Sequence, residues 1–138
     1  MILIDSNIII DIIENDPRWS DWSIEQIVQL SAEHDVAINE VVIAEAAPGM
    51  ATLEAFRREM ERIDVTIESI DADAAFLAGR AFRAYRQRRR EGAKSILADF
   101  LIGGHAQALN ATVLTRDPRF YRSYFPTVPL ITPEAESA

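Results

Sequence analysis

The sequence predicts an α/β fold, namely a three-layer α/β/α sandwich around a mainly parallel sheet of four or five strands. Short aliphatic runs alternate along the chain with longer segments of helical periodicity, which is the pattern of successive βαβ units. Polar residues that favour caps and turns follow the first and fourth aliphatic runs directly. Because 138 residues can enclose one core, we expect a single domain over residues 1–138 with a frayed tail at 133–138.

Each predicted element has a local signal. Runs of β-branched and aliphatic residues between turn formers predict strands over residues 2–4, 36–38, 65–69, 112–115 and 127–131. Apolar residues at helical spacing, often behind a capping residue, predict helices over residues 8–13, 20–34, 40–47, 53–63, 71–91 and 95–110, with a short helical turn from 118. Pro129 confines the last strand to a sheet edge, and Gly92 to Lys94 form a hinge.

The composition excludes several kinds of site. The absence of cysteine excludes disulfides, thiolate metal sites and cysteine nucleophiles, and only two histidines, His34 and His105, argue against a zinc site. Any metal would be held by oxygen, which favours Mg²⁺ or Mn²⁺. We expect a packed or surface role for His105 rather than a catalytic one.

The chain also carries no sign of a membrane protein. No apolar stretch approaches the length of a membrane span, and the N-terminus lacks the basic region of a signal peptide. We therefore expect a cytoplasmic protein.

Asp99 is the most informative single residue. It stands among six apolar neighbours inside a predicted helix, in Ile96-Leu-Ala-Asp99-Phe-Leu-Ile102, so helix capping does not explain it. A lone ionised carboxylate is costly to bury unless it is paired or bound to a metal. A buried ion pair with an arginine is the structural alternative, and the metal ligand is favoured once the other acids are considered.

Three further carboxylates have comparable settings. Asp5 follows the first strand and Asp117 the fourth, although each is also a good helix N-cap, the latter because Pro118 comes next. Glu45 lies in an apolar helical run, although an exposed glutamate on a short helix is common. Ordinary surface or capping roles explain Asp11, Asp71 and Asp73.

These acids can converge on one crevice, because the carboxyl ends of parallel strands meet at the same sheet edge. Several carboxylates a few ångströms apart cannot all stay ionised unaided, and a divalent cation removes that conflict. Such a cation supports displacement at phosphorus, so phosphodiester hydrolysis is the chemistry indicated. We expect the Asp5 carboxylate to point away from the helix backbone toward a cation shared with Asp99, while Ser6 caps the helix.

At this point the chain resembles a PIN domain, and more narrowly a VapC-type toxin ribonuclease of a bacterial or archaeal toxin–antitoxin pair. The resemblance covers nearly the whole chain. It lies in Ile2-Leu-Ile-Asp5-Ser-Asn7, in Glu45 near the end of an apolar run, in Asp99-Phe-Leu-Ile102 followed by His105-Ala, and in Leu114-Thr-Arg-Asp117-Pro.

The resemblance implies a site, a strand order and partners. It implies an acidic quartet that is catalytic and holds Mg²⁺ or Mn²⁺, namely Asp5, Glu45, Asp99 and Asp117. Asn7 and Thr115 match polar supporting positions, and the implied strand order is 3-2-1-4-5. The implied partners are an RNA substrate, a second copy in a homodimer and a VapB-like antitoxin whose C-terminal segment crosses the site.

An arginine-rich segment offers a way for an acidic protein to bind RNA. The formal net charge is -8, yet seven of the 14 basic residues lie between Arg80 and Lys94. Because arginine binds phosphate through bidentate contacts, we predict substrate contacts from Arg80, Arg83, Arg86, Arg89, Arg90 and Lys94. A solvated helix face that balances nearby acids is the alternative.

Trp19 and Trp22 flank the start of the second predicted helix. We expect them to pack on the domain's own core. The alternative is an anchor for a partner chain, since tryptophan is favoured at interfaces.

Two other functions compete with the nuclease. One is a catalytically idle PIN-like binding module that acts through protein partners. The other is an aspartyl-phosphate phosphatase with Asp5 as nucleophile. It is disfavoured because Asn7 stands where a second aspartate is needed and Lys94 is the only lysine.

Overall fold

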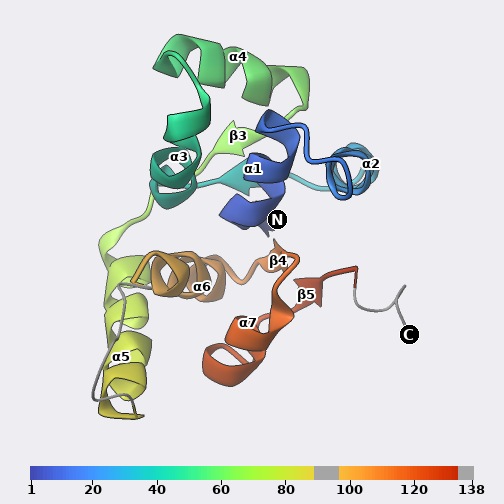
Figure 1. Cartoon of the computed structure of the whole chain (residues 1–138). Helices are drawn as coiled ribbons and strands as arrows, with labels where there is room; N and C mark the ends of the chain where they lie inside the picture. The colour runs from blue at the N-terminus through green and yellow to red at the C-terminus, as the bar shows by residue number, and fades with distance from the viewer. Residues whose placement is uncertain (89–96, 134–138) are drawn as a thin grey trace.

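The computed structural model describes residues 1–88 and 97–133, and its centre is a five-stranded sheet (Figure 1). The strands are β1 (Ile2–Ile4), β2 (Val36–Ile38), β3 (Thr66–Ile67), β4 (Thr112–Leu114) and β5 (Leu130–Ile131). Every pairing is parallel, in the order β3-β2-β1-β4-β5. The predicted α/β class and the implied strand order are confirmed.

Helices flank the sheet. They are α1 (Ser6–Ile13), α2 (Ser20–Ser31), α3 (Glu40–Ala46), α4 (Leu53–Arg62), α5 (Ala72–Arg88), α6 (Leu97–Leu109) and α7 (Pro118–Tyr124), with a 3₁₀ turn at Ala47–Gly49. The predicted hinge at 92–94 and the predicted helix start at Ser95 lie outside the described residues. Within the described part of the chain, no helix is long and apolar enough to cross a membrane.

The two edge strands are shorter than predicted because turns take up their ends. The Val65 N–H donates to the Met60 carbonyl and closes α4 instead of entering the sheet. The Val128 N–H donates to the Phe125 carbonyl and closes a turn after α7. Strand pairing is therefore left to two residues in each of β3 and β5.

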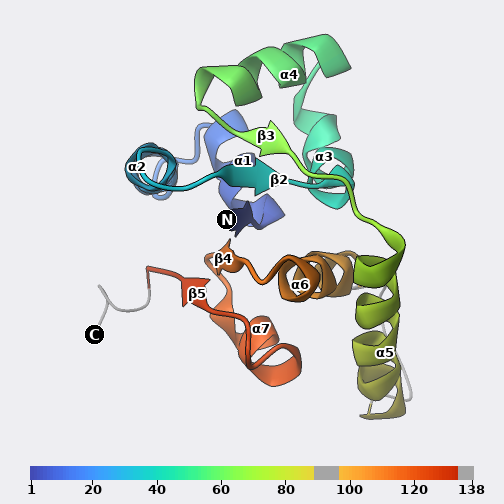
Figure 2. The ribbon, with the colours of Figure 1, turned by 180° about the vertical axis from the view of Figure 1, so that it is seen from behind.

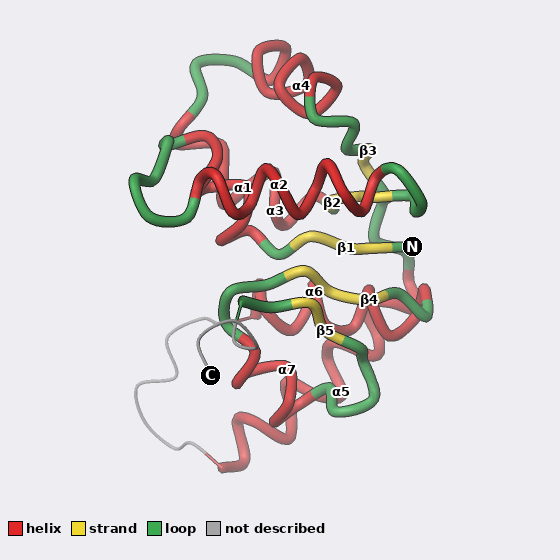
Figure 3. Tube along the Cα trace, turned by 90° about the vertical axis from the view of Figure 1, so that its right-hand side faces the viewer, coloured by secondary structure: helices red, strands yellow, loops and turns green. Residues whose placement is uncertain are grey.

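The switch point of the sheet lies between β1 and β4 (Figure 3). From β1 the chain proceeds outward through β2 to β3, and it then returns to the other side of β1 to form β4 and β5. The Asp5 N–H donates to the Leu114 carbonyl at 2.9 Å, which joins the carboxyl ends of the two central strands. Such a switch point is where open α/β sheets bind ligands.

Close packing fixes the position of α6. This helix lies between the sheet and α5, which is at the outside of the molecule (Figures 1 and 2). A Cβ atom on Gly104 would stand 2.6 Å from the Ala78 backbone nitrogen, and one on Gly103 would collide with the Phe125 ring. The Phe100 ring packs edge-on against Phe120, with centroids 4.8 Å apart. Two glycines and an aromatic cluster thus hold the helix that carries Asp99.

Two side chains of uncertain role belong to the core. His105 is 1% exposed, its Nδ1 lies 3.1 Å from the Asn39 side-chain nitrogen, and burial lowers its pKa. The prediction of a packed histidine is confirmed. Trp22 packs against the core cluster, as expected, whereas Trp19 stays partly exposed and meets Trp22 edge to face at 6.0 Å.

Candidate active site

An acidic cavity of about 170 Å³ opens at the carboxyl edge of the central strands. It is lined by Asp5, Ser6, Asn7, Asp99, Asp117, Phe120 and Tyr121. Three of the four predicted acids therefore share one cavity, although they come from the loops after β1 and β4 and from α6.

Asp5 serves the helix and the cavity at once. Its Oδ1 accepts a hydrogen bond from the Ser6 N–H at 2.7 Å, so Asp5 itself is the N-cap of α1. The expectation that Ser6 takes the cap role and that the Asp5 carboxylate points away from the backbone is wrong. The carboxylate has two oxygens, and capping uses only Oδ1.

Thr115 ties the two central strand ends together. Its buried hydroxyl donates to Asp5 Oδ2 at 2.8 Å and accepts from the Asp117 N–H at 2.9 Å. The Asn7 side chain reaches the same loop, because its Oδ1 accepts from the Arg116 N–H at 3.3 Å. This network orients the loops that present Asp5 and Asp117.

Asp117 differs from Asp5 in how the helix uses it. It occupies the N-cap position of α7, yet its side chain makes no capping hydrogen bond. The carboxylate is exposed and lines the cavity. The alternative of a simple helix cap is therefore wrong for this side chain.

Asp99 lies on α6, two residues after Leu97, and the predicted start of this helix at Ser95 lies outside the described residues. The pKa of Asp99 is raised to about 6, with burial as the largest cause. The charges of neighbouring carboxylates add to the effect, in the order Asp5, Glu45 and Asp117.

The pKa of Asp5 is also raised, because this carboxylate is fully buried. Hydrogen bonding from Thr115 is the largest opposing effect. The buried Tyr121 hydroxyl also lowers the pKa of Asp5, although it forms no hydrogen bond of regular geometry with the described residues. Tyr121 was not predicted; its position four residues after Asp117 on α7 was the available signal.

Glu45 stands at the margin of the site. It lies near the end of α3, is exposed and does not line the acidic cavity. Its charge nevertheless raises the pKa of both Asp5 and Asp99. The structure therefore places Glu45 near the other acids without bringing it into the cavity.

Asp11 departs from its predicted surface or capping role. It is 4% exposed and forms a two-pronged ion pair with Arg116, with Asp11 Oδ1 to Arg116 Nη2 at 2.9 Å. A buried ion pair with an arginine is thus found at Asp11, and among the described residues Asp99 forms no ion pair. The pair joins α1 to the loop after β4.

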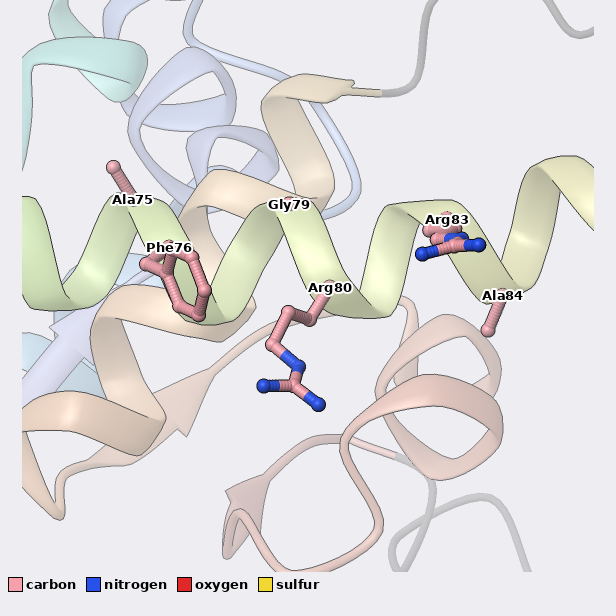
Figure 4. Close-up of a pocket in the computed structure, with 6 residues that line it drawn as sticks. All are labelled: Ala75, Phe76, Gly79, Arg80, Arg83 and Ala84. Atoms are coloured by element: carbon pink, nitrogen blue, oxygen red, sulfur yellow. The ribbon is translucent and has the colours of Figure 1, made fainter.

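Three of the predicted RNA-binding arginines, Arg80, Arg83 and Arg86, lie along α5. Arg80 and Arg83 line an open groove of about 730 Å³ together with Phe76, Gly79 and two alanines (Figure 4). Arg86 lies over the Phe82 ring at 6.0 Å. This groove shares no lining residue with the acidic cavity. The other predicted members, Arg89, Arg90 and Lys94, lie outside the described residues.

The acidic cavity fits a cation that brings its own water. In the described ranges, no three carboxylate or imidazole groups stand close enough to enclose a metal ion as they are placed. Mg²⁺ does not need such a cage, because it commonly keeps several waters and binds one or two carboxylates. Asp99 and Asp5, whose charge opposes the ionisation of Asp99, meet that requirement.

Carboxylates gathered at the switch point of a parallel sheet define an α/β domain with an acidic ligand site. The family model of the PIN domain matches residues 2–126, and the chain belongs to the PIN domain family. No curated protein matches the sequence.

Several solved structures share the fold. VapBC2 from Rickettsia felis, bound to a DNA fragment from its promoter, is 24% identical, with 96% of this chain and 98% of that chain covered and a TM-score of 0.70. FitAcB from Neisseria gonorrhoeae is 21% identical, with 97% and 99% covered and a TM-score of 0.64. VapBC-1 from nontypeable Haemophilus influenzae is 19% identical, with 96% and 98% covered and a TM-score of 0.65.

Changing Asp99 to Asn should raise the melting temperature of the protein in EDTA by a few degrees near neutral pH. The raised pKa keeps Asp99 protonated to about pH 6 in the folded chain, whereas the unfolded chain loses this proton near 3.8. The native protein therefore becomes less stable as the pH rises between these values. The Asp99→Asn protein has no carboxylate at this position and does not lose this stability. The gain should disappear at about pH 4.

The matched control is Asp73→Asn, which also removes a carboxylate from a first helical turn but lies exposed on α5. Equal effects of the two substitutions, or an Asp99→Asn effect that is the same at both pH values, would contradict the described repulsion.

Proposed function

We propose that the protein is a Mg²⁺- or Mn²⁺-dependent endoribonuclease of the cytoplasm, and the toxin of a VapBC-like type II toxin–antitoxin pair. One observation carries the proposal: Asp5, Asp99 and Asp117 line a single cavity at the switch point of the sheet. Membership of the PIN domain family supports a nuclease, and the fold is similar to that of the VapBC structures.

In this proposal Asp5 and Asp99 hold the cation, with Glu45 and Asp117 nearby. A bound divalent cation supplies Lewis acidity for hydrolysis at phosphorus. The chain's own contribution is orientation: Thr115 fixes Asp5, and the aromatic cluster around Phe100 fixes the first turn of α6. Because Asp117 is exposed and unused by its helix, its carboxylate is available to accept a proton from the attacking water.

An antitoxin is the proposed protein partner. The structures of similar fold include a toxin–antitoxin complex from Klebsiella pneumoniae and the VapBC complex of Salmonella typhimurium. A partner arginine inserted beside Asp5 and Asp99 would relieve their repulsion through charge-assisted hydrogen bonds. The test is to express the chain together with the product of a short neighbouring reading frame. This product should co-purify with the chain and block RNA cleavage. A product that does not bind the chain would contradict this partnership.

The exposed face of α5 supports the proposed homodimer. Phe76 is 65% exposed, the highest value among the large apolar side chains of the described residues. If two α5 helices cross antiparallel between Gly79 and Arg80, Phe76 of one copy meets Arg83 of the other, and the same pair forms again on the other side of the crossing. Such reciprocal pairs are what a two-fold interface requires.

The same arginines support the proposed contact with the RNA backbone. Rings of Phe82 and Tyr85 lie 5.3 and 5.6 Å from that of Phe100, the neighbour of Asp99. The C-terminal half of α5 is therefore level with the first turn of α6, and Arg83 and Arg86 lie at the end nearer the acids. This position is suited to phosphates on either side of the scissile one.

A catalytically idle binding module is the alternative function. It needs no cation, and the repulsion that raises the pKa of Asp99 would then be a cost without a purpose. Cleavage of RNA separates the two functions.

Purified protein should cleave a mixed RNA pool with Mg²⁺ or Mn²⁺ and not in EDTA. Asp5→Ala and Asp99→Ala should each lower the rate by at least about 100-fold, because a bound cation contributes several kcal/mol of charge stabilisation. Asp73→Asn is the control for loss of an exposed acid. Full cleavage by folded Asp5→Ala or Asp99→Ala protein would overturn the proposed site.

The double variant Arg83→Ala/Arg86→Ala separates the two roles of α5. Weaker RNA binding with an unchanged sedimentation coefficient would support the phosphate contact. In that case the salt dependence of RNA binding should fall as well. Dissociation of a dimer at unchanged RNA affinity would support the interface instead. Phe76→Ala serves as the control, because it disturbs an interface but removes no charge.

A further inference from the structure

A second groove opens directly beside the acidic cavity. It has a volume of about 310 Å³ and is lined by Arg18, Trp19, Arg116, Asp117, Pro118, Arg119, Thr132 and Pro133. Asp117 lines both this groove and the acidic cavity. The two spaces therefore adjoin, unlike the α5 groove, which has no lining residue in common with the acids.

Trp19 is held in place as the flat wall of this groove. Its ring meets Trp22 edge to face, at 84° between the ring planes. The Trp19 N–H and the Arg18 N–H both donate to Asp16 Oδ1, at 2.8 and 2.9 Å, which fixes the turn before α2. A partly exposed indole in a fixed position is a ready surface for stacking.

The three arginines of the groove differ in their contacts and in their exposure to solvent. Arg116 is tied to buried Asp11, and its guanidinium carbon lies 5.0 Å from the centroid of the Trp19 ring, so it stiffens the wall. Arg18 lies at the same distance from that ring but is exposed, as is Arg119. Among the described residues, neither Arg18 nor Arg119 has a carboxylate within ion-pair distance.

A fixed aromatic ring with exposed arginines beside it is the chemistry that binds single-stranded nucleic acid. Bases of any sequence stack on aromatic faces, and guanidinium groups bind phosphates in a bidentate manner. We propose that this groove binds the nucleotide next to the scissile phosphodiester, with its base on the Trp19 wall and its phosphates on Arg18 and Arg119. The inference rests on the proposed ribonuclease function.

The charge of the chain favours RNA as the occupant. With a net charge of -8, the protein repels a polyanion, and the carboxylates of the cavity repel it most where it must be cut. Cations that adjoin the cavity are therefore needed to hold the strand in place. A partner protein with acidic side chains is the other occupant that such arginines fit, and the experiment distinguishes it.

The test is a binding titration with single-stranded RNA in EDTA, which prevents cleavage and so separates binding from the proposed activity. A Trp22→Phe background leaves Trp19 as the only tryptophan, because the chain has two. RNA should quench its fluorescence. In the native background, Trp19→Ala should weaken binding by about tenfold, the value of one stacked base, and Trp19→Phe should weaken it less.

The double variant Arg18→Ala/Arg119→Ala should also weaken RNA binding and lower the salt slope by about two phosphate contacts. The matched control is Arg57→Ala/Arg58→Ala, two exposed arginines on α4, which lies at the far end of the molecule from β5 (Figure 1). Melting temperatures show that each variant is folded.

Three results would overturn the proposal. They are no quenching of Trp19, an RNA affinity unchanged in folded Trp19→Ala protein, and a groove double variant that loses a co-purified protein partner while it keeps its RNA affinity. Absence of cleavage with intact, groove-dependent RNA binding would count against the proposed ribonuclease function but would leave the groove assignment in place.

Discussion

The hydrogen bond from the Thr115 hydroxyl to the Asp5 carboxylate is the contact on which the site depends. It is buried, spans 2.8 Å and joins the ends of β1 and β4, where the topology of the sheet reverses. Because Asp5 also caps α1, one carboxylate sets the start of that helix and one wall of the cavity. The same hydroxyl accepts the Asp117 N–H and so positions the next acid. The loops that carry Asp5 and Asp117 are thus fixed by the strands.

The acidic cavity lowers the stability of the folded chain. Burial and neighbouring charges raise the pKa of Asp99, so the folded protein without a cation holds a carboxylate in an unfavourable place. The cost persists because two glycines and Phe100 give α6 no freedom to withdraw. Functional sites are where a chain departs from the arrangement that stability alone would favour.

Much of the fold could be predicted, because it follows from local patterns. Aliphatic runs mark the strands, and Asp5, Asp99 and Asp117 stand out by their sequence surroundings. What was not predicted depends on three-dimensional detail, namely that Asp11 is the acid that meets Arg116 and that Asp5 itself caps α1. The groove beside Trp19 was also missed, since it combines residues 18–19 with residues 116–119 and 132–133. No local sequence pattern encodes that proximity.

The most direct test of the account is a titration with Mn²⁺ near neutral pH, in which free Mn²⁺ is followed by its electron paramagnetic resonance signal. The account predicts saturable binding by the native protein and a loss of affinity of about 100-fold or more in the double variant Asp5→Asn/Asp99→Asn, whose two ligands are neutral. Asp73→Asn should bind as the native protein does. Equal Mn²⁺ affinity in the double variant and the native protein would contradict the claim that this cavity holds the cation.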